Sequence, residues 1–188
     1  MSEEATSVGI ERTDGVVLLR PFRPEDAGPL WEAANESIAE VFAWLPWCHP
    51  GYSREQAEAW VAARPVAWAN REELSFAITD AATGRFLGGC GLNSFHKAHR
   101  MANLGYWIRT SAAGRGATTR ATVLLARFGL REVGLQRIEI LADVGNRASQ
   151  RVAEKAGAQR EGVLRHRLFH HERVSDAVIY SLVASDPI

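Results

Sequence analysis

The feature that most constrains this chain is a strand that runs into a glycine loop, which leads directly into a helix. The apolar strand is predicted over 104–108, the loop after it contains Gly114 and Gly116, and apolar residues then recur at helical spacing over 117–131. This arrangement turns several main-chain N–H groups and the positive end of a helix dipole toward one point. It favours a binding site for a phosphate or diphosphate, although an ordinary turn is the simpler interpretation of these residues alone.

A second segment further along the chain repeats the change from strand to helix. The pattern predicts a strand over 137–141 and a helix over 147–156 that ends at Gly157, a residue type common just after a helix. Asn146 stands at the start of this helix and Ser149 in its first turn. Taken alone, the segment indicates that Asn146 is a helix N-cap and Ser149 an exposed polar residue.

The rest of the chain predicts a mixture of helices and strands. One helix begins near Pro24 and another at Ser53, where Ser53 and Gln56 match the pattern of a capping box. The remaining predicted strands are 16–19, 74–79, 86–92, 104–108, 160–169 and 173–183. We therefore expect one α+β domain over residues 1–188, with a mixed, mostly antiparallel sheet of about seven strands.

Composition limits the classes of protein to which the chain can belong. Of its 188 residues 46% are apolar and 23% charged, as in ordinary soluble domains, and no apolar run approaches the roughly 20 residues of a membrane span. The acidic Glu3 and Glu4 do not resemble the basic start of a secretory signal, so we expect a cytoplasmic protein that does not bind membranes. Cys48 and Cys90 fit no disulfide or zinc pattern, so we expect them to be buried and expect no metal site.

The net charge of zero hides an uneven distribution along the chain. Residues 1–80 carry 14 acidic and 6 basic side chains, whereas residues 81–188 carry 8 and 16. Either the two halves pair with each other in the folded protein, or the basic half binds an anion and the acidic half a cation. Composition leaves both interpretations open. Nucleic acid is not an expected partner, because the charge is balanced overall and no stripe of basic and aromatic residues is present.

Taken together and in order, the motifs resemble those of the GCN5-related N-acetyltransferases (GNAT), and more narrowly the Rim-type enzymes that acetylate ribosomal-protein N-termini. The motifs that carry the resemblance are Leu19–Pro21, Trp44–Trp47, Gly105–Ile108, Gly114–Gly116, Asn146 with Ser149, Glu154–Gly157, Glu161–Gly162 and Asp176. The resemblance implies the GNAT fold, with helices on both faces of the sheet and a splay between the fourth and fifth strands. It also implies that acetyl-CoA is the cofactor, with its pantetheine arm lying in the splay like an extra strand.

The resemblance also implies roles for individual residues. The diphosphate of acetyl-CoA would lie on the main-chain amides of Gly114 to Thr118, with Arg115 and Arg120 adding positive charge beside it. Ser149 would be catalytic, because the family pattern places it near the thioester sulfur, where it protonates the departing thiolate. The residues implied to bind the cofactor are Trp107, Ile108, Arg109, Gly114, Arg115, Gly116, Ala117, Thr118, Asn146 and Ser149.

The general base is the residue that the resemblance does not supply. Asn103 stands where many relatives carry a glutamate, and Leu168 stands near the place of a second one. Histidine titrates near neutrality, so His96 is the predicted catalytic base, with His99 or a water molecule as alternatives and ordinary loop residues as the simpler interpretation of both histidines. An α-amine with a pKa of about 7.7–8.0 needs less help from a base than a lysine amine near 10.4, because more of it is neutral at pH 7.

We therefore predict an enzyme that transfers an acetyl group from acetyl-CoA directly to a primary amine in a ternary complex. The missing bases favour the α-amine of a protein or peptide N-terminus as the acceptor. The alternatives are a small amine, such as an amino acid or antibiotic, and a silent acyl-CoA-binding module. The predicted substrate-binding residues are Trp44 and Trp47, whose indoles can stack on a cationic group, and Asn103. The amine substrate is the expected partner. Relatives of the kind that the chain resembles often dimerise, so the sequence leaves both a monomer and a homodimer open.

Overall fold

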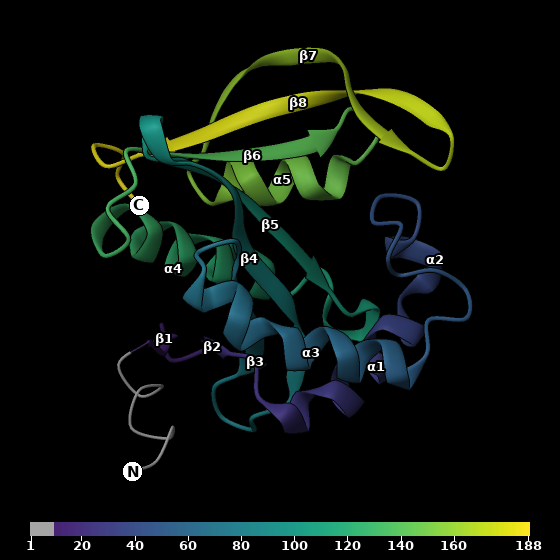
Figure 1. Cartoon of the computed structure of the whole chain (residues 1–188). Helices are drawn as coiled ribbons and strands as arrows, with labels where there is room; N and C mark the ends of the chain where they lie inside the picture. Colours follow the sequence, from purple (N-terminus) through teal and green to yellow (C-terminus); the bar gives the residue numbers. More distant parts are fainter. Residues whose placement is uncertain (1–9) are drawn as a thin grey trace.

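The computed structural model describes residues 10–188 and is built around one eight-stranded sheet (Figure 1). The expectation drawn from Glu3 and Glu4 lies outside the described residues. The strands are β1 (Arg12–Thr13), β2 (Val17–Pro21), β3 (Leu74–Asp80), β4 (Phe86–His96), β5 (Met101–Ile108), β6 (Arg137–Asp143), β7 (Gln159–His170) and β8 (Arg173–Val183). They lie in the order β1-β2-β3-β4-β5-β6-β8-β7. Every neighbouring pair is antiparallel except β5 and β6.

This topology confirms the predicted α+β class and the mixed, mostly antiparallel sheet. The strand that the sequence pattern did not predict is β1, which has two residues and pairs with β2 through Arg12 and Thr13. A segment of that length gives no alternation of apolar and polar residues. The sheet therefore has eight strands, one more than expected from the pattern.

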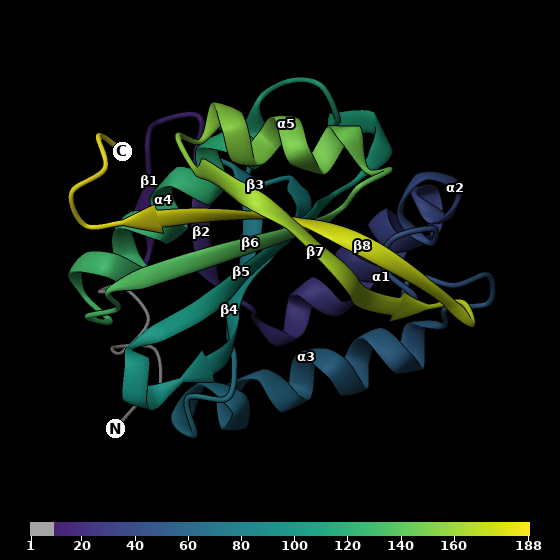
Figure 2. The ribbon, with the colours of Figure 1, turned by 90° about the horizontal axis from the view of Figure 1, so that it is seen from above.

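Helices cover both faces of the sheet, as the resemblance implied (Figure 2). The helices are α1 (Ala27–Glu36), α2 (Ile38–Val41), α3 (Arg54–Ala69), α4 (Ala117–Arg131) and α5 (Arg147–Lys155), with single 3-10 turns at Pro24–Asp26, Lys97–His99 and Thr110–Ala112. α1 and α3 pack together on one face, whereas α4 and α5 pack together on the other. None of the helices within residues 10–188 combines the length and the apolar character that crossing a bilayer requires.

Each face of the sheet has its own apolar core. Phe76, Leu104 and Leu125 are fully buried in the core beneath α4, whereas Leu30 and Val61 lie in the core beneath α1 and α3. Burying a side chain of this size stabilises the fold by about 1.5–3 kcal/mol. Cys48 and Cys90 are buried as expected, one in each core. The two cores hold the sheet rigid between the helical layers, so the strands can position a site precisely at their ends.

Local signals in the sequence fix the ends of two helices as predicted. Ser53 and Gln56 form a reciprocal capping box at the start of α3, because the Gln56 amide donates to Ser53 Oγ at 3.3 Å and the Ser53 amide donates to Gln56 Oε1 at 2.8 Å. Gly157 follows α5 with φ of +88°. Glycine adopts this left-handed conformation at little cost, so α5 ends there.

The parallel strands β5 and β6 pair over three residues and then diverge (Figure 1). The pairs are Met101 with Arg137, Ala102 with Ile138 and Asn103 with Glu139. Within residues 10–188, no pair joins 104–108 to 140–143. The facing edges of the two strands therefore leave main-chain groups without a strand partner, which is the splay that the resemblance implied between its fourth and fifth strands.

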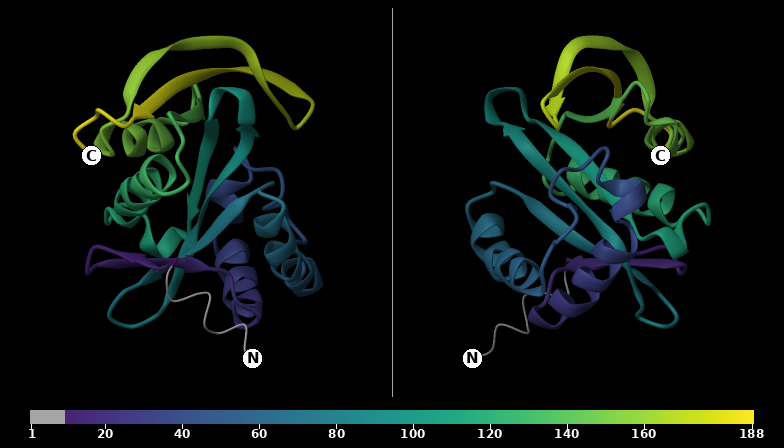
Figure 3. Two further views of the ribbon diagram at one scale, coloured as in Figure 1. Left: turned by 60° about the vertical axis from the view of Figure 1, so that its left-hand side comes forward. Right: turned by 90° about the vertical axis from the view of Figure 1, so that its right-hand side faces the viewer.

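The β7–β8 hairpin extends past the sheet and curls toward α2 (Figure 1, Figure 3). A register shift between Leu164 and Leu168 bends β7, and His166 in this bend has φ of +53°. At the tip of the hairpin a ring nitrogen of His171 lies 2.7 Å from the carbonyl oxygen of Phe42. The hairpin tip and the segment after α2 are therefore in contact, although they are far apart in the sequence.

Candidate active site

The glycine loop lies directly before α4 and leaves the start of that helix open. Gly114 and Gly116 have φ of +75° and +83°, and a Cβ on either residue would meet no atom within 4 Å. Gly116 is the N-cap residue, and no side chain from the described part of the chain caps the helix. The amide of Arg120 donates to the Gly116 carbonyl at 3.1 Å, so the amides of residues 117–119 precede the first helical hydrogen bond. Free N–H groups and open space beside two glycines fit a diphosphate.

The splay continues this open region along β5. Trp107 and Ile108 lie at the end of β5 nearest the glycine loop. Main-chain groups on an unpaired strand edge can bind an extended ligand that carries amide groups, as they would bind another strand. The pantetheine arm of acetyl-CoA is such a ligand, so the loop and the splay together fit acetyl-CoA. The individual residues implied to contact it stay predictions.

Tyr106 crosses the splay and contacts Ser149 in the first turn of α5. The Tyr106 hydroxyl donates to the main-chain oxygen of Ser149 at 2.8 Å, and Ser149 Oγ donates to the Tyr106 hydroxyl at 3.2 Å. Burial raises the pKa of Tyr106 to about 12, although the hydrogen bond from Ser149 acts in the opposite direction. Tyr106 therefore stays protonated at neutral pH and holds the serine hydroxyl beside the splay. The sequence motif contained Tyr106 but gave it no role, because only the splay brings it to Ser149.

Asn146 caps α5, which is the simpler of the two interpretations made from the sequence. Its Oδ1 accepts a hydrogen bond from the Ser149 amide at 3.0 Å. This cap fixes the first turn of α5 and therefore the position of Ser149. The cap uses only the carbonyl oxygen of the Asn146 side chain, and a contact between Asn146 and the cofactor stays a prediction.

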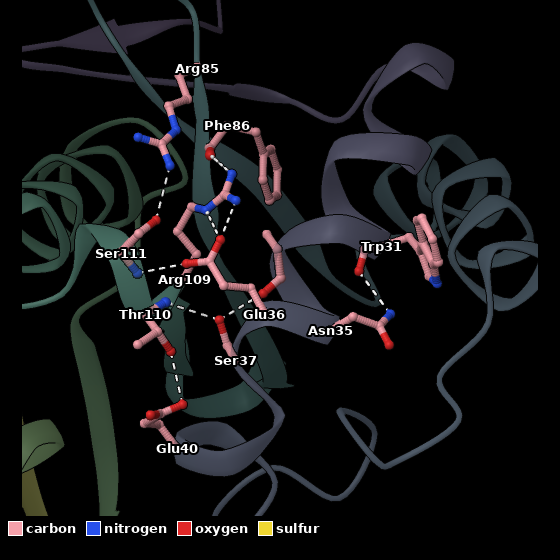
Figure 4. Close-up of polar contacts among 11 residues, drawn as sticks. Trp31, Asn35, Glu36, Ser37, Glu40, Arg85, Phe86, Arg109, Thr110 and Ser111 are labelled. Atoms are coloured by element: carbon pink, nitrogen blue, oxygen red, sulfur yellow. Dashed lines mark hydrogen bonds and ion pairs between the residues drawn. The ribbon is translucent and has the colours of Figure 1, made fainter.

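A network of hydrogen bonds ties the segment before the glycine loop to the end of α1 (Figure 4). Glu36 accepts from Arg109 Nε at 2.9 Å and from the main-chain amide of Ser111 at 2.7 Å. The hydrogen bond from Arg109 is the main reason that the pKa of Glu36 falls to about 2. Glu36 is therefore ionised at neutral pH and anchors the chain where it leaves β5.

The same network continues to α2. Ser37 Oγ accepts from the amide of Thr110 at 3.0 Å, and Thr110 Oγ1 donates to Glu40 Oε2 at 2.9 Å (Figure 4). Ser37 is fully buried and also donates to the carbonyl oxygen of Ala33 at 2.7 Å. The glycine loop is therefore positioned from the acidic first half of the chain, which sequence patterns did not reveal.

The structure separates Arg115 and Arg120, which the resemblance placed beside the phosphates, and Arg109, which it assigned to the cofactor. The guanidinium of Arg109 is engaged by Glu36, and Arg120 pairs with Asp14 at 2.7 Å. Arg115 is exposed within the glycine loop. Both ion pairs join the acidic half of the chain to the basic half, which supports the interpretation that the halves pair with each other. A charged contact with the phosphates therefore rests on Arg115.

A cavity of about 640 Å³ lies between three parts of the chain. They are residues 38–44, here named the α2 segment, the end of β6 with the turn after it, and the tip of the β7–β8 hairpin. Trp44 lines this cavity and packs against the turn after β6, where a Cβ on Gly145 would lie 3.4 Å from the indole. Trp47 lies apart from it, with its ring centroid 5.2 Å from that of Trp107 and its side chain partly exposed. Of the two tryptophans predicted to bind substrate, Trp44 is the one in the cavity.

The cavity lies on the same face of the sheet as Asn103. Successive residues of a strand point to opposite faces, and Asn103 is paired with Glu139, so Asn103 and Asp143 share a face while Tyr106 points to the other. Asn103 Nδ2 donates to Asn93 Oδ1 at 3.1 Å. Its own Oδ1 is buried and has no hydrogen-bond partner within residues 10–188. An N–H donor such as an amine would satisfy this oxygen.

His96, the predicted base, lies at the opposite end of β5 from Ser149. The rings of His96 and His99 stack at 4.3 Å in the β4–β5 turn, and His96 Nδ1 accepts from the His99 amide at 3.3 Å. This turn leads into Met101, and five residues of strand, or about 16 Å, separate Met101 from Tyr106. The structure therefore does not bring His96 to the splay, and the base assigned from the sequence does not fit the geometry.

Five polar residues that line the cavity received no functional role from the sequence. They are Asp143, His170, His171, Arg173 and Ser175. They form no recognisable sequence motif, because Asp143 ends β6 and the others lie in the later β7–β8 hairpin. Only the bend of the hairpin brings them together.

The comparisons with known proteins agree with this geometry. Residues 17–159 match the family model described as an acetyltransferase (GNAT) domain. YdaF of Bacillus subtilis, provisionally named a ribosomal N-acetyltransferase, is 37% identical over 50% of this chain and 53% of its own length. The chain therefore matches about half the length of YdaF. YoaA of the same organism, an uncharacterised N-acetyltransferase, is 28% identical over 89% of this chain and 93% of its own length.

A solved structure shows the same architecture over nearly the whole chain. The protein, from Vibrio cholerae, is provisionally named a ribosomal-protein-serine acetyltransferase. It is 25% identical, with a TM-score of 0.80 over 92% of this chain and 97% of that one. The splay, the glycine loop and Ser149 all lie inside the family match. The chain therefore belongs to the GNAT N-acetyltransferases, whose cosubstrate is acetyl-CoA, and its relatives favour the Rim-type branch.

Proposed function

We propose that the protein transfers the acetyl group of acetyl-CoA to the α-amine of a protein or peptide N-terminus. The observation that carries this proposal is that the splay has a different site on each side. The open start of α4 and the unpaired strand edges lie on one side, and the cavity of about 640 Å³ lies on the other. Two substrates can therefore bind at once and meet at the splay, as direct transfer in a ternary complex requires.

Ser149 is the proposed acid of the reaction. When bound, acetyl-CoA supplies an acetyl thioester, whose sulfur leaves with a negative charge. Ser149 is partly exposed, and its Oγ is held 3.2 Å from the Tyr106 hydroxyl. Rotation about the Cβ–Oγ bond redirects the serine proton without moving the main chain. Proton transfer from a positioned group contributes typically about 10²–10⁴ in rate.

Asn103 and Trp44 are the proposed contacts of the acceptor. The indole of Trp44, which lines the cavity, can stack on the positive charge of the amine. Asn103 lies on the same face outside the cavity lining, and its unpartnered Oδ1 can accept a hydrogen bond from another N–H group of the acceptor. Neither group can remove a proton from the amine. These contacts therefore suit an amine that loses its proton easily.

An N-terminal α-amine meets this requirement better than a lysine side chain does. At pH 7 roughly a tenth of an α-amine is neutral, compared with about 0.04% of a lysine amine. The names of YdaF and of the Vibrio cholerae protein, both of which refer to ribosomal substrates, also support a protein acceptor. Both arguments favour a protein or peptide N-terminus over a lysine side chain.

Thiol release from acetyl-CoA in the presence of different amines tests the proposal. We expect turnover with short peptides that have a free N-terminus, and none with the same peptides after the α-amine is blocked and one lysine is left free. Turnover with free amino acids alone would assign a small-amine acceptor instead. Calorimetric binding of acetyl-CoA without turnover on any amine would leave a silent binding module.

A further inference from the structure

The cavity contains a histidine and a carboxylate that the proposed function has not used. Nε2 of His170, at the end of β7, lies 3.9 Å from Oδ2 of Asp143, at the end of β6. Both residues line the cavity, and their side chains are only 15% and 11% exposed. The distance is too long for a direct hydrogen bond, but a protonated imidazole at this position would form an ion pair with the carboxylate.

Asp143 is held in place by the turn that leads into α5. Its Oδ1 accepts from the Gly145 amide at 2.7 Å, and its main-chain oxygen accepts from Gln150 Nε2 at 2.9 Å. Its other carboxylate oxygen, Oδ2, is the atom that faces His170. Asp143 is therefore held by the same turn that presents Ser149.

The pair and Ser149 lie on opposite faces of the splayed strands. Asp143 is on the face of Asn103, whereas Tyr106, which holds Ser149, points to the other face. An amine that enters from the cavity therefore approaches from one face, and the departing sulfur is protonated from the other. A group that accepts the proton of the amine has to lie on the cavity side, where His170 is.

We propose that His170 is the general base of the transfer reaction and that Asp143 is the residue that positions its ring; this rests on the proposed function. Because Nε2 faces Asp143, Nδ1 accepts the proton, directly or through one water molecule. The amine nitrogen forms the new C–N bond to the acetyl carbon as the C–S bond breaks. The proton of the amine passes to His170, and the thiolate takes the hydroxyl proton of Ser149. His170 and Ser149 then return to their starting states by proton exchange with water.

Other charged and polar groups of the cavity also surround His170. They are Asp143 from β6 and His171, Arg173 and Ser175 from the hairpin. The α2 segment contributes only uncharged side chains to the lining. Ser175 Oγ is buried without a hydrogen-bond partner within residues 10–188, so it can hold a water molecule that relays the proton. A test of His170 therefore needs a readout that these neighbours do not share.

The ratio of wild-type kcat/KM to that of His170→Gln, measured across pH, is such a readout. The test uses acetyl-CoA and a short peptide with a free N-terminal serine. Titration of the peptide amine is common to both enzymes and cancels in the ratio. A general base acts only in its unprotonated form, so the ratio should rise from near one in acid to about 10²–10⁴ at alkaline pH. A ratio that stays constant with pH would overturn the proposal, because lost packing lowers the rate equally at every pH.

A double-mutant cycle tests whether Asp143 acts through His170. Asp143→Asn alone should lower kcat/KM by about tenfold, and it should have no further effect when His170→Gln is already present. Additive losses would contradict a positioning role. His166→Gln, on the exposed bend of the same strand, is the matched control and should change kcat/KM less than about twofold. If His170→Gln does not fold by circular dichroism, His170→Asn serves for the same ratio.

Binding measurements separate this inference from the proposed function. The dissociation constants of acetyl-CoA and of the peptide should change less than about threefold in His170→Gln. A loss of peptide affinity as large as the loss of rate would assign His170 to binding and overturn its role as base. If the wild type turns over no amine at all, the proposed function fails as well. If the wild type is active and the ratio is flat, only the role of His170 fails.

Discussion

The two sides of the splay are built from different parts of the polypeptide. The side that fits acetyl-CoA consists mainly of main-chain groups: the amides before α4 and the unpaired edges of β5 and β6. The acceptor side consists of side chains from three distant segments, namely the α2 segment, the end of β6 and the hairpin tip. The first side therefore depends on backbone conformation, and the second depends on the identity of single side chains.

The largest expected effect on cofactor binding tests the main-chain side. Gly116→Val forces a β-branched residue to adopt φ of +83° and fills the space beside the open amides. We expect the dissociation constant of coenzyme A, measured by calorimetry, to rise by on the order of 100-fold. Gly84→Val is the matched control, because Gly84 has φ of +73° and open space in the β3–β4 turn. Wild-type affinity in Gly116→Val would show that the loop is not the phosphate site.

The next effect tests the point where the two sides meet. Ser149→Ala should lower kcat by about 10- to 1000-fold, because the thiolate loses its proton donor. The dissociation constant of coenzyme A should change little, since the mutation leaves the loop intact. Tyr106→Phe, which removes only the partner of Ser149, should lose less activity. Unchanged turnover in Ser149→Ala would exclude Ser149 as the acid.

A smaller effect is expected on the acceptor side. Trp44→Ala should raise the KM of the acceptor peptide by about tenfold while coenzyme A binds normally, because the indole lines the cavity on the acceptor side. Trp47→Ala is the comparison, since Trp47 packs against Trp107 instead. Compared with Trp44→Ala, Trp47→Ala should lower the melting temperature more and raise the KM of the acceptor peptide less. A larger rise in KM with Trp47→Ala would place the acceptor on Trp47, as the sequence also allowed.

The smallest effect concerns the anchor of the glycine loop. The pKa of Glu36 is about 2 in the folded protein against an ordinary value of 4.5. Its carboxylate therefore stabilises the fold above about pH 4.5, and this contribution is lost as the pH falls toward 2. Glu36→Gln should remove about 1 kcal/mol or less at pH 7, because the pair with Arg109 is partly exposed. When thermal unfolding is followed across pH, the difference in free energy of unfolding between the wild type and Glu36→Gln should shrink in acid.

The sequence could predict the main-chain side because its residues are close together along the chain. Gly114 and Gly116 follow one strand, and Asn146 and Ser149 follow the next, so strand and helix patterns place them without tertiary information. The cavity could not be predicted in this way, because a bend in β7 brings His170 to Asp143. His96 was assigned because histidine titrates near neutrality, which says nothing about its place in the fold. The β4–β5 turn carries it away from the splay.

The contact between the hairpin tip and the segment after α2 has a consequence for how such an enzyme can diverge. The end of β6 forms one wall of the cavity, and the segment after α2 and the hairpin tip form the others. The two residues that contact each other there, His171 and Phe42, are not part of the buried cores of the sheet. Exchange of residues 42–44 for another loop would change which amine the cavity admits, while the hairpin keeps the proposed base His170 and the sheet keeps its fold.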